Sequence, residues 1–64
     1  MEDYQKRVVV EKEDLDQKIV KLAAFLFSEK SAAVDIEEYE RMLQQFYTMM
    51  EYSRCLNKRI VCFK

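Results

Sequence analysis

Apolar residues recur along the first half of the chain at the spacing of one face of an α-helix. The stripe consists of Val8, Leu15, Ile19, Leu22 and Leu26. Steps of three and four residues keep side chains on one side of a helix, so this pattern predicts a helix over about residues 3–27. The helical period outweighs the strand preference of the three consecutive β-branched valines at positions 8–10.

A second stripe of the same period predicts a helix over about residues 36–62. Its members are Tyr39, Met42 or Leu43, Phe46, Met49 or Met50, Ser53, Leu56, Ile60 and Phe63. The segment SEKSAAVD, residues 28–35, is small and polar and predicts a loop, and Asp35 followed by Glu38 is typical of a capping box. Because the connection is short, we expect an all-α, antiparallel two-helix hairpin that forms a single domain over residues 1–64.

A lone hairpin of this sequence leaves apolar surface uncovered. Val8, Val9 and Val10 span about 200° of the helix circumference, which is wider than one partner helix covers. The segments KLAAFLF and MLQQFYTMM are also apolar around more than half of the helix. A single copy would therefore expose a large apolar patch, and we expect the chain to form a homo-oligomer.

Composition excludes several classes of function. The 64 residues include no histidine and no glycine, so we expect neither a Cys/His zinc site nor a glycine-rich phosphate loop, and no cofactor. Cys55 and Cys62 lie two turns apart, roughly 10 Å, which is too far for a disulfide bond, and we expect free thiols in a reducing cytoplasm. No apolar run is long enough to span a membrane, and Glu2 and Asp3 stand where a signal peptide has basic residues. A net charge of −1 gives no general attraction to DNA.

Charge is distributed unevenly along the expected hairpin. The acids of residues 29–40 are Glu29, Asp35, Glu37, Glu38 and Glu40. The bases of the last thirteen residues are Arg54, Lys58, Arg59 and Lys64. Antiparallel packing adds Lys6 and Arg7 to this basic end, which either complements the helix dipole or, in a symmetric assembly, surrounds a phosphate-bearing ligand. On the first helix, the i,i+4 spacing predicts the ion pairs Arg7–Glu11 and Asp14–Lys18.

The sequence shows no catalytic apparatus. Adjacent acids such as Glu37 and Glu38 are typical of a solvated surface, so we expect a protein that is not an enzyme. A helical mutase of the chorismate mutase kind, whose helices LDQKIVKL loosely resembles, is the third-ranked alternative. Tyr4, Tyr47 and Tyr52 either stack on a nucleotide base or lie at an interface with the hydroxyl group at its rim.

Two segments together resemble a known family of small phage proteins. They are QKRVVVEKEDLDQKIVKLAAFL, with the pattern RVxxExxxLxxKIxKLxxF, and QFYTMMEYSRCLNKRI, with the pattern QxxxMxxYSxxLxxRI. The matching positions are Arg7, Val8, Glu11, Leu15, Lys18, Ile19, Lys21, Leu22, Phe25, Gln45, Met49, Tyr52, Ser53, Leu56, Arg59 and Ile60. Over residues 5–60, the chain resembles the anti-CBASS nucleotide sponges, whose hairpin is shared with an anti-Thoeris sponge.

This resemblance implies a hexamer that binds cyclic di- or trinucleotides between its protomers without cleaving them. By sequestering such second messengers in the cytoplasm of the infected bacterium, the phage would block host antiviral signalling. The implied ligand contacts are Arg7, Tyr52, Ser53, Arg59 and Lys18, the last of which otherwise serves only as the partner of Asp14.

The chain also departs from this family. The longer segment that precedes the hairpin in the sponges supplies a tyrosine and a lysine to their pocket, and we do not carry these two residues over. The β-rich extension of the anti-Thoeris form has no counterpart here, which disfavours NAD-derived signals as ligands. The runner-up hypothesis is a phage structural or adaptor protein whose exposed stripe docks onto a partner helix.

Overall fold

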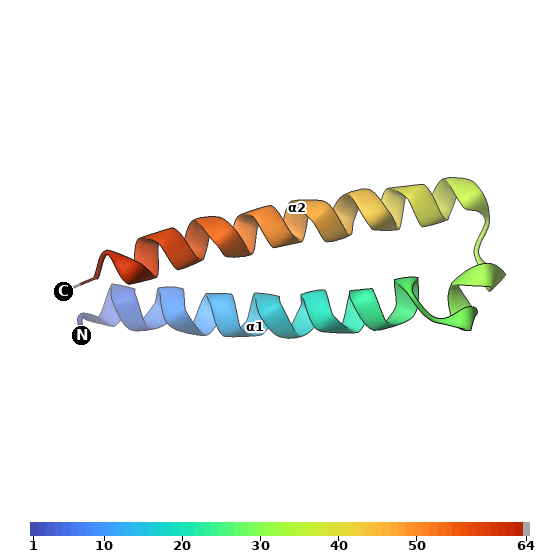
Figure 1. Ribbon diagram of the computed structural model, residues 1–64. Helices are drawn as coiled ribbons and strands as arrows, with labels where there is room; N and C mark the ends of the chain where they lie inside the picture. The colour runs from blue at the N-terminus through green and yellow to red at the C-terminus, as the bar shows by residue number, and fades with distance from the viewer. Residues whose placement is uncertain (64) are drawn as a thin grey trace.

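The chain folds into two long helices that lie antiparallel, joined by one short helical turn (Figure 1). The computed structural model describes residues 1–63. Helix α1 spans Asp3–Leu26, the 3₁₀ helix η1 spans Glu29–Ala33 and helix α2 spans Ile36–Val61. The body measures 46 × 14 × 13 Å, with both chain ends at one end of the rod and η1 at the other (Figure 1). The predicted all-α hairpin is confirmed, and each long helix ends one residue before its expected limit.

Side chains at the start of each long helix satisfy backbone N–H groups that have no partner within the helix. The Glu2 backbone N–H donates to the Gln5 side-chain oxygen at 2.8 Å, so buried Gln5 closes the start of α1. At the start of α2, the Asp35 carboxylate accepts from the backbone N–H of Glu38 at 2.8 Å. Only this half of the expected capping box is present in residues 1–63, because the Glu38 carboxylate accepts from the Arg41 Nε at 2.9 Å instead.

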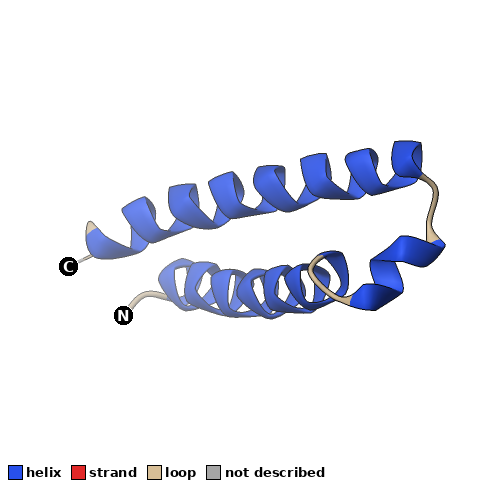
Figure 2. Cartoon of the chain, turned by 45° about the vertical axis from the view of Figure 1, so that its right-hand side comes forward, coloured by secondary structure: helices blue, strands red, loops and turns tan. Residues whose placement is uncertain are grey.

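The connection predicted as a loop contains a 3₁₀ helix, and serine hydroxyl groups account for it. Ser28 accepts from the backbone N–H of Lys30 at 3.2 Å and donates to the carbonyl oxygen of Phe25 at 2.8 Å. Ser31 donates to the carbonyl oxygen of Ser28 at 2.9 Å. These local bonds guide the reversal between the helices (Figure 2), and within residues 1–63 no residue takes a positive φ. The chain therefore turns without needing a glycine.

The seam between the helices is narrow. In residues 1–63, the buried apolar residues are Val8, Leu26 and Leu56, with exposed fractions of 5%, 2% and 1%. Ser53 is buried too, and the other members of both predicted stripes are half-buried except for Met50, which is exposed while Met49 takes the inner position. The three valines divide as their angular spread predicts, since Val9 is half-buried and Val10 is 52% exposed. One hairpin thus buries one stripe per helix and leaves the remaining apolar residues in contact with solvent.

Within the part of the chain that the structure describes, no helix combines the length and the hydropathy needed to cross a bilayer. Cys55 and Cys62 are both free thiols on the exposed surface.

Candidate functional site

Tyr52 on α2 and Glu11 on α1 meet across the seam, and their contact defines one long face of the hairpin. The Tyr52 hydroxyl group donates to the Glu11 carboxylate, while 46% of Tyr52 stays exposed. Arg7 and Lys18 lie four residues before and seven residues after Glu11, spacings that put them on the same side of α1. Arg59 lies seven residues after Tyr52 and shares its side of α2 for the same reason. We call this surface the tyrosine face, and it brings together four of the five predicted ligand contacts.

Arg7 and Arg59 of this face lie at the same level along the hairpin axis. Tyr4 packs edge-on against Phe63 with ring centroids 5.9 Å apart, and Tyr52 contacts Glu11. This antiparallel register places position 59 beside position 7. Both arginines are exposed, and within residues 1–63 neither forms an ion pair. The two guanidinium groups therefore direct positive charge toward solvent. Along the hairpin axis, they lie about two helical turns, roughly 10 Å, from Tyr52.

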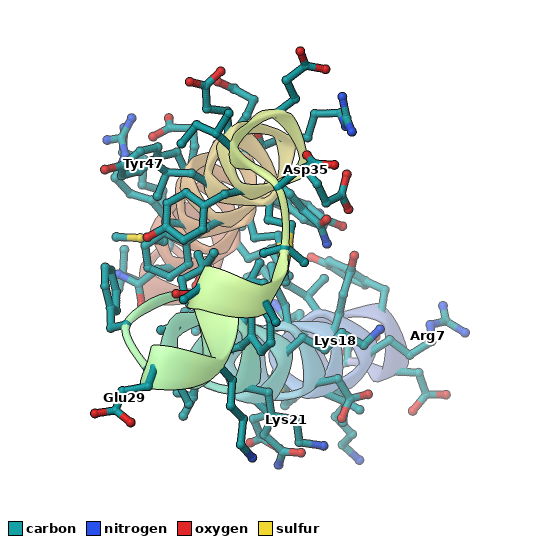
Figure 3. The ribbon with its side chains drawn as sticks, turned by 90° about the vertical axis from the view of Figure 1, so that its right-hand side faces the viewer. Arg7, Lys18, Lys21, Glu29, Asp35 and Tyr47 are labelled. Atoms are coloured by element: carbon teal, nitrogen blue, oxygen red, sulfur yellow. The ribbon has the colours of Figure 1, made fainter. Side chains whose placement is uncertain are left out.

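The expected ion pairs Arg7–Glu11 and Asp14–Lys18 are wrong. Glu11 bonds to Tyr52 instead, and the ion pairs of residues 1–63 are Lys12–Asp16, Glu38–Arg41 and Glu51–Arg54. The i,i+4 rule identifies possible partners on one helix, but Glu11 bonds to Tyr52 of the opposite helix instead. Because these pairs do not form in residues 1–63, Arg7 and Lys18 are available to bind an external anion. Figure 3 shows both side chains on the same side of the hairpin.

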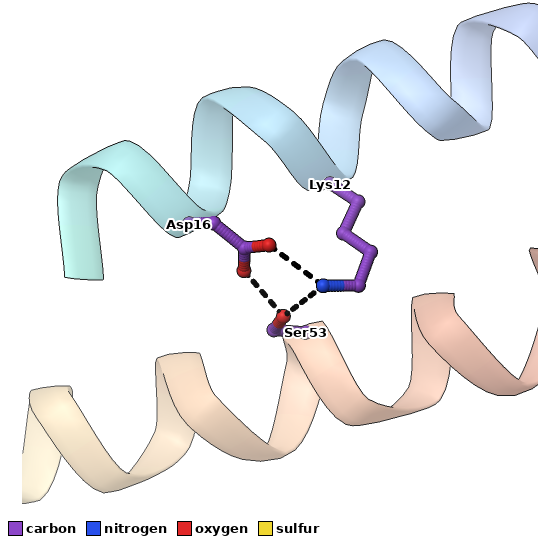
Figure 4. A network of polar contacts seen from close by, with 3 residues as sticks. All are labelled: Lys12, Asp16 and Ser53. Atoms are coloured by element: carbon purple, nitrogen blue, oxygen red, sulfur yellow. Dashed lines mark hydrogen bonds and ion pairs between the residues drawn. The ribbon is translucent and has the colours of Figure 1, made fainter. Parts of the chain in front are cut away.

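Ser53, the fifth predicted contact, lies in the seam rather than on the tyrosine face. It is 9% exposed, and it donates to Asp16 Oδ1 at 2.5 Å and accepts from Lys12 Nζ at 3.2 Å (Figure 4). Lys12 also pairs with Asp16 Oδ2 at 2.6 Å. The hydroxyl group of Ser53 is therefore engaged by α1, and its role as a ligand contact stays a prediction.

This three-residue network was missed by the sequence reasoning, although a signal for it exists. Lys12 and Asp16 are four residues apart, and Ser53 is the one serine in a stripe of otherwise apolar and aromatic residues. Hydrogen bonds from Lys12 and then from Ser53 hold the pKa of Asp16 below its ordinary value of 3.8, against the opposing effect of partial burial. The network thus keeps an ionised carboxylate paired at the edge of the helix contact.

The basic end is smaller than the sequence suggests. Arg54 donates to Glu51 through Nε at 2.9 Å and through Nη2 at 2.5 Å, which lowers the pKa of Glu51 and neutralises this arginine locally. Lys64 lies outside the described residues. The bases that remain there without an acidic partner in residues 1–63 are Lys6, Arg7, Lys58 and Arg59.

These features define a class, namely short all-α hairpins that present a cationic face bearing a tyrosine. Within that class, the chain belongs to the Sequestin family, whose model matches residues 2–61. It is similar to an uncharacterized 7.5 kDa protein in the denB-rIIB intergenic region of Enterobacteria phage T4, with 46% identity over 61 residues that cover 95% of each chain. No solved structure matches the chain. The resemblance to a phage family of sequestering proteins is thereby confirmed.

Proposed function

We propose that the chain is a phage protein that binds and sequesters a nucleotide second messenger of the host without catalysing its conversion. The family name and the phage relative support sequestration by a phage protein. In the cytoplasm of the infected bacterium, such binding would lower the free messenger concentration and block antiviral signalling. Catalysis has no role in this scheme, since capture of the ligand is enough.

The observation that carries the proposal is the pair Arg7 and Arg59, which lie at one level of the tyrosine face with no acidic partner in residues 1–63. Guanidinium groups bind phosphate oxygens by paired, charge-assisted hydrogen bonds that contribute roughly 1.5–3 kcal/mol each. Tyr52 supplies an exposed ring, and stacking of a base on an aromatic side chain contributes about 1–3 kcal/mol. Two phosphate-binding groups beside a stacking group suit a ligand with several phosphates and bases.

Cyclic di- and trinucleotides are the ligand class that we assign on this basis. They carry two or three phosphates in a closed ring. Because the ring already restricts the ligand, little conformational entropy is lost on binding. A symmetric assembly, a hexamer in our proposal, repeats the arginine pair around such a ring. Lys18 adds a further cation to the same face, whereas Ser53 would reach a ligand only after leaving Asp16.

Isothermal titration calorimetry tests this function with cyclic dinucleotides, cyclic trinucleotides and messengers derived from ADP-ribose. We expect heat with at least one cyclic oligonucleotide, and we expect chromatography to recover that ligand unchanged. Heat with an ADP-ribose messenger alone would keep sequestration but refute the ligand class. No heat with any compound, at concentrations where light scattering shows the assembly intact, would refute nucleotide sequestration altogether, and turnover would refute the non-enzymatic role.

Variants of α2 connect the heat to the tyrosine face. Arg59→Ala removes one phosphate-binding group and should abolish measurable binding while the mass of the assembly stays unchanged. Arg41→Ala is the matched control, because Arg41 lies at the opposite end of α2 and pairs with Glu38. Equal affinity of the Arg59→Ala variant and the unmodified chain would show that Arg59 does not bind the ligand.

A phage adaptor protein is the second candidate, and the exposed apolar residues favour it. An amphipathic helix of a partner protein would then dock onto the hairpin. Recovery of one stoichiometric protein partner, together with no affinity for nucleotides, would support this function over sequestration.

A further inference from the structure

The two long faces of the hairpin differ in chemistry. The tyrosine face carries Arg7, Lys18 and Arg59. The opposite surface, which we call the apolar face, carries Val20 and Phe27 from α1 and Ile36, Leu43, Tyr47, Met50 and Val61 from α2. In the view along the hairpin from its loop end, Tyr47 lies on one side and Arg7 and Lys18 lie on the other (Figure 3).

Contacts across the seam join the two helices into this apolar face. Asp16 and Ile19 of α1 line a shallow groove of about 400 Å³ together with Met50 of α2. Val20 and Asp16 line the adjoining hollow on α1. Phe27 packs edge-on against Phe46 at the loop end, with ring centroids 6.0 Å apart.

Helical spacing extends the face along α2 and along the loop half of α1, whereas the same side of α1 nearer its start carries Glu13 and Lys6. Phe27 follows Val20 by seven residues, and Leu43, Met50 and Val61 follow Ile36 by seven, fourteen and twenty-five residues. Four of these side chains are among the most exposed apolar residues of the chain. Their exposed fractions are 67% for Val20, 72% for Phe27, 68% for Ile36 and 70% for Val61. An exposed apolar surface of this extent is typical of an interface with a partner.

The charged groups that line the groove, Lys12, Asp16 and Arg54, have partners within the chain. Lys12, Asp16 and Ser53 form a closed hydrogen-bonded network (Figure 4), and Arg54 pairs with Glu51. Covering the part of the face around this groove would therefore bury charged groups that already have partners, which lowers the electrostatic cost of burial there. On the tyrosine face, by contrast, Arg7 and Arg59 have no acidic partner in residues 1–63, so covering that face with another copy would bury uncompensated charge.

We infer that the apolar face packs against the apolar face of a second copy of this chain, so that two hairpins form a four-helix bundle with the tyrosine faces directed outward. A two-fold axis brings the same patch of both copies together, and this requires a patch that is self-complementary and free of net charge. The dimensions suit this partner. One long face of a body of 46 × 14 × 13 Å has a projected area on the order of 600 Å², comparable with the ~800 Å² per partner of a standard interface.

This inference rests on the self-association in the proposed function and assigns its interface to the apolar face. It does not depend on which ligand the protein binds. The test is the mass in solution, by light scattering, of the double variant Val20→Glu, Met50→Glu. We expect the assembly to dissociate, because the variant places four like charges in the interface of two copies. The matched control is Gln45→Glu, which adds an acid seven residues from Tyr52 on the tyrosine face and should leave the mass unchanged.

Mixing provides a test that holds even if the acidic variant unfolds. The variant Val20→Lys, Met50→Lys should also dissociate alone, and an equimolar mixture of the acidic and basic variants should recover both the helical circular dichroism and the mass of the assembly. An acidic variant that stays assembled, a control that dissociates equally, or a mixture that fails to reassemble would each overturn the assignment of the apolar face. An intact assembly without nucleotide affinity would instead refute sequestration and leave this interface standing.

Discussion

At the scale of single residues, competition for Glu11 shapes the tyrosine face. Arg7 is the nearest partner of Glu11 along α1, yet Glu11 accepts a hydrogen bond from Tyr52 of α2. The hydroxyl group of Tyr52 is held at the seam while nearly half of the residue remains exposed. One interaction therefore positions the aromatic ring and leaves the Arg7 guanidinium group without an acidic partner in residues 1–63.

Substitution of Tyr52 separates the role of its ring from that of its hydroxyl group. Tyr52→Ala should weaken binding of the cyclic oligonucleotide by about tenfold or more, because loss of base stacking costs about 1–3 kcal/mol. Tyr52→Phe keeps the ring and should change the affinity by less than about threefold. Titration calorimetry measures both constants. If the phenylalanine variant loses as much affinity as the alanine variant, the hydroxyl group and not the ring contacts the ligand.

Asp16 gives a second prediction at this scale, which concerns stability and pH. Its pKa is lowered in the folded chain, so its contribution to stability is present above the ordinary value of 3.8 and is lost as the pH falls through the lowered pKa. Because the Asp16 side chain is 44% exposed, we expect Asp16→Asn to cost only about 0.5–1 kcal/mol at neutral pH. This difference should vanish once the pH falls below the lowered pKa of Asp16.

Urea unfolding at neutral and acid pH measures the effect of Asp16→Asn, and Asp14→Asn is its control. Asp14 has no ion pair in the described chain and should be replaceable without loss at either pH. An equal cost for both variants, or a cost at Asp16 that does not depend on pH, would rule out the network with Lys12 and Ser53 as its origin.

At the scale of helices, the sequence predicts what depends on local periodicity and misses what depends on the partner helix. Both long helices and the N-cap at Asp35 follow from spacing and from residue type. The 3₁₀ turn of the connection escapes prediction because serine hydroxyl groups close it in a segment without glycine or proline. In the candidate site, the surface positions Arg7 and Arg59 follow from the pattern, whereas the burial of Ser53 depends on contacts with α1.

The start of α2 gives a prediction at this scale. Asp35→Ala removes the bond to the backbone N–H of Glu38 and should lower the free energy of unfolding by about 1 kcal/mol. Asp35→Asn keeps an accepting oxygen and should cost much less. Chemical unfolding followed by circular dichroism measures both values. Equal losses for the two variants would indicate that the charge of Asp35 near the helix dipole, not its cap bond, stabilises α2.

At the scale of the whole molecule, two groups of exposed apolar residues require different explanations. The apolar face accounts for Val20 and Met50, but Val10 is 52% exposed and lies almost directly behind α1, away from the seam. A pair of hairpins joined through the apolar face would leave Val10 uncovered. An assembly larger than a pair, such as the proposed hexamer, offers a second type of contact that covers Val10 as well.

Thermal unfolding at different concentrations tests this dependence of the fold on assembly. A hairpin that buries three apolar residues among residues 1–63 has too small a core to be stable alone, so folding and association should be coupled. In coupled unfolding of a pair, each tenfold increase in protein concentration adds about 1.4 kcal/mol of stability. The Tm should therefore rise by several degrees between micromolar and hundred-micromolar protein, with an oligomeric mass in the folded range. A Tm independent of concentration, together with the mass of a single copy, would show that one hairpin suffices to form the fold, and the shared interfaces would lose their physical basis.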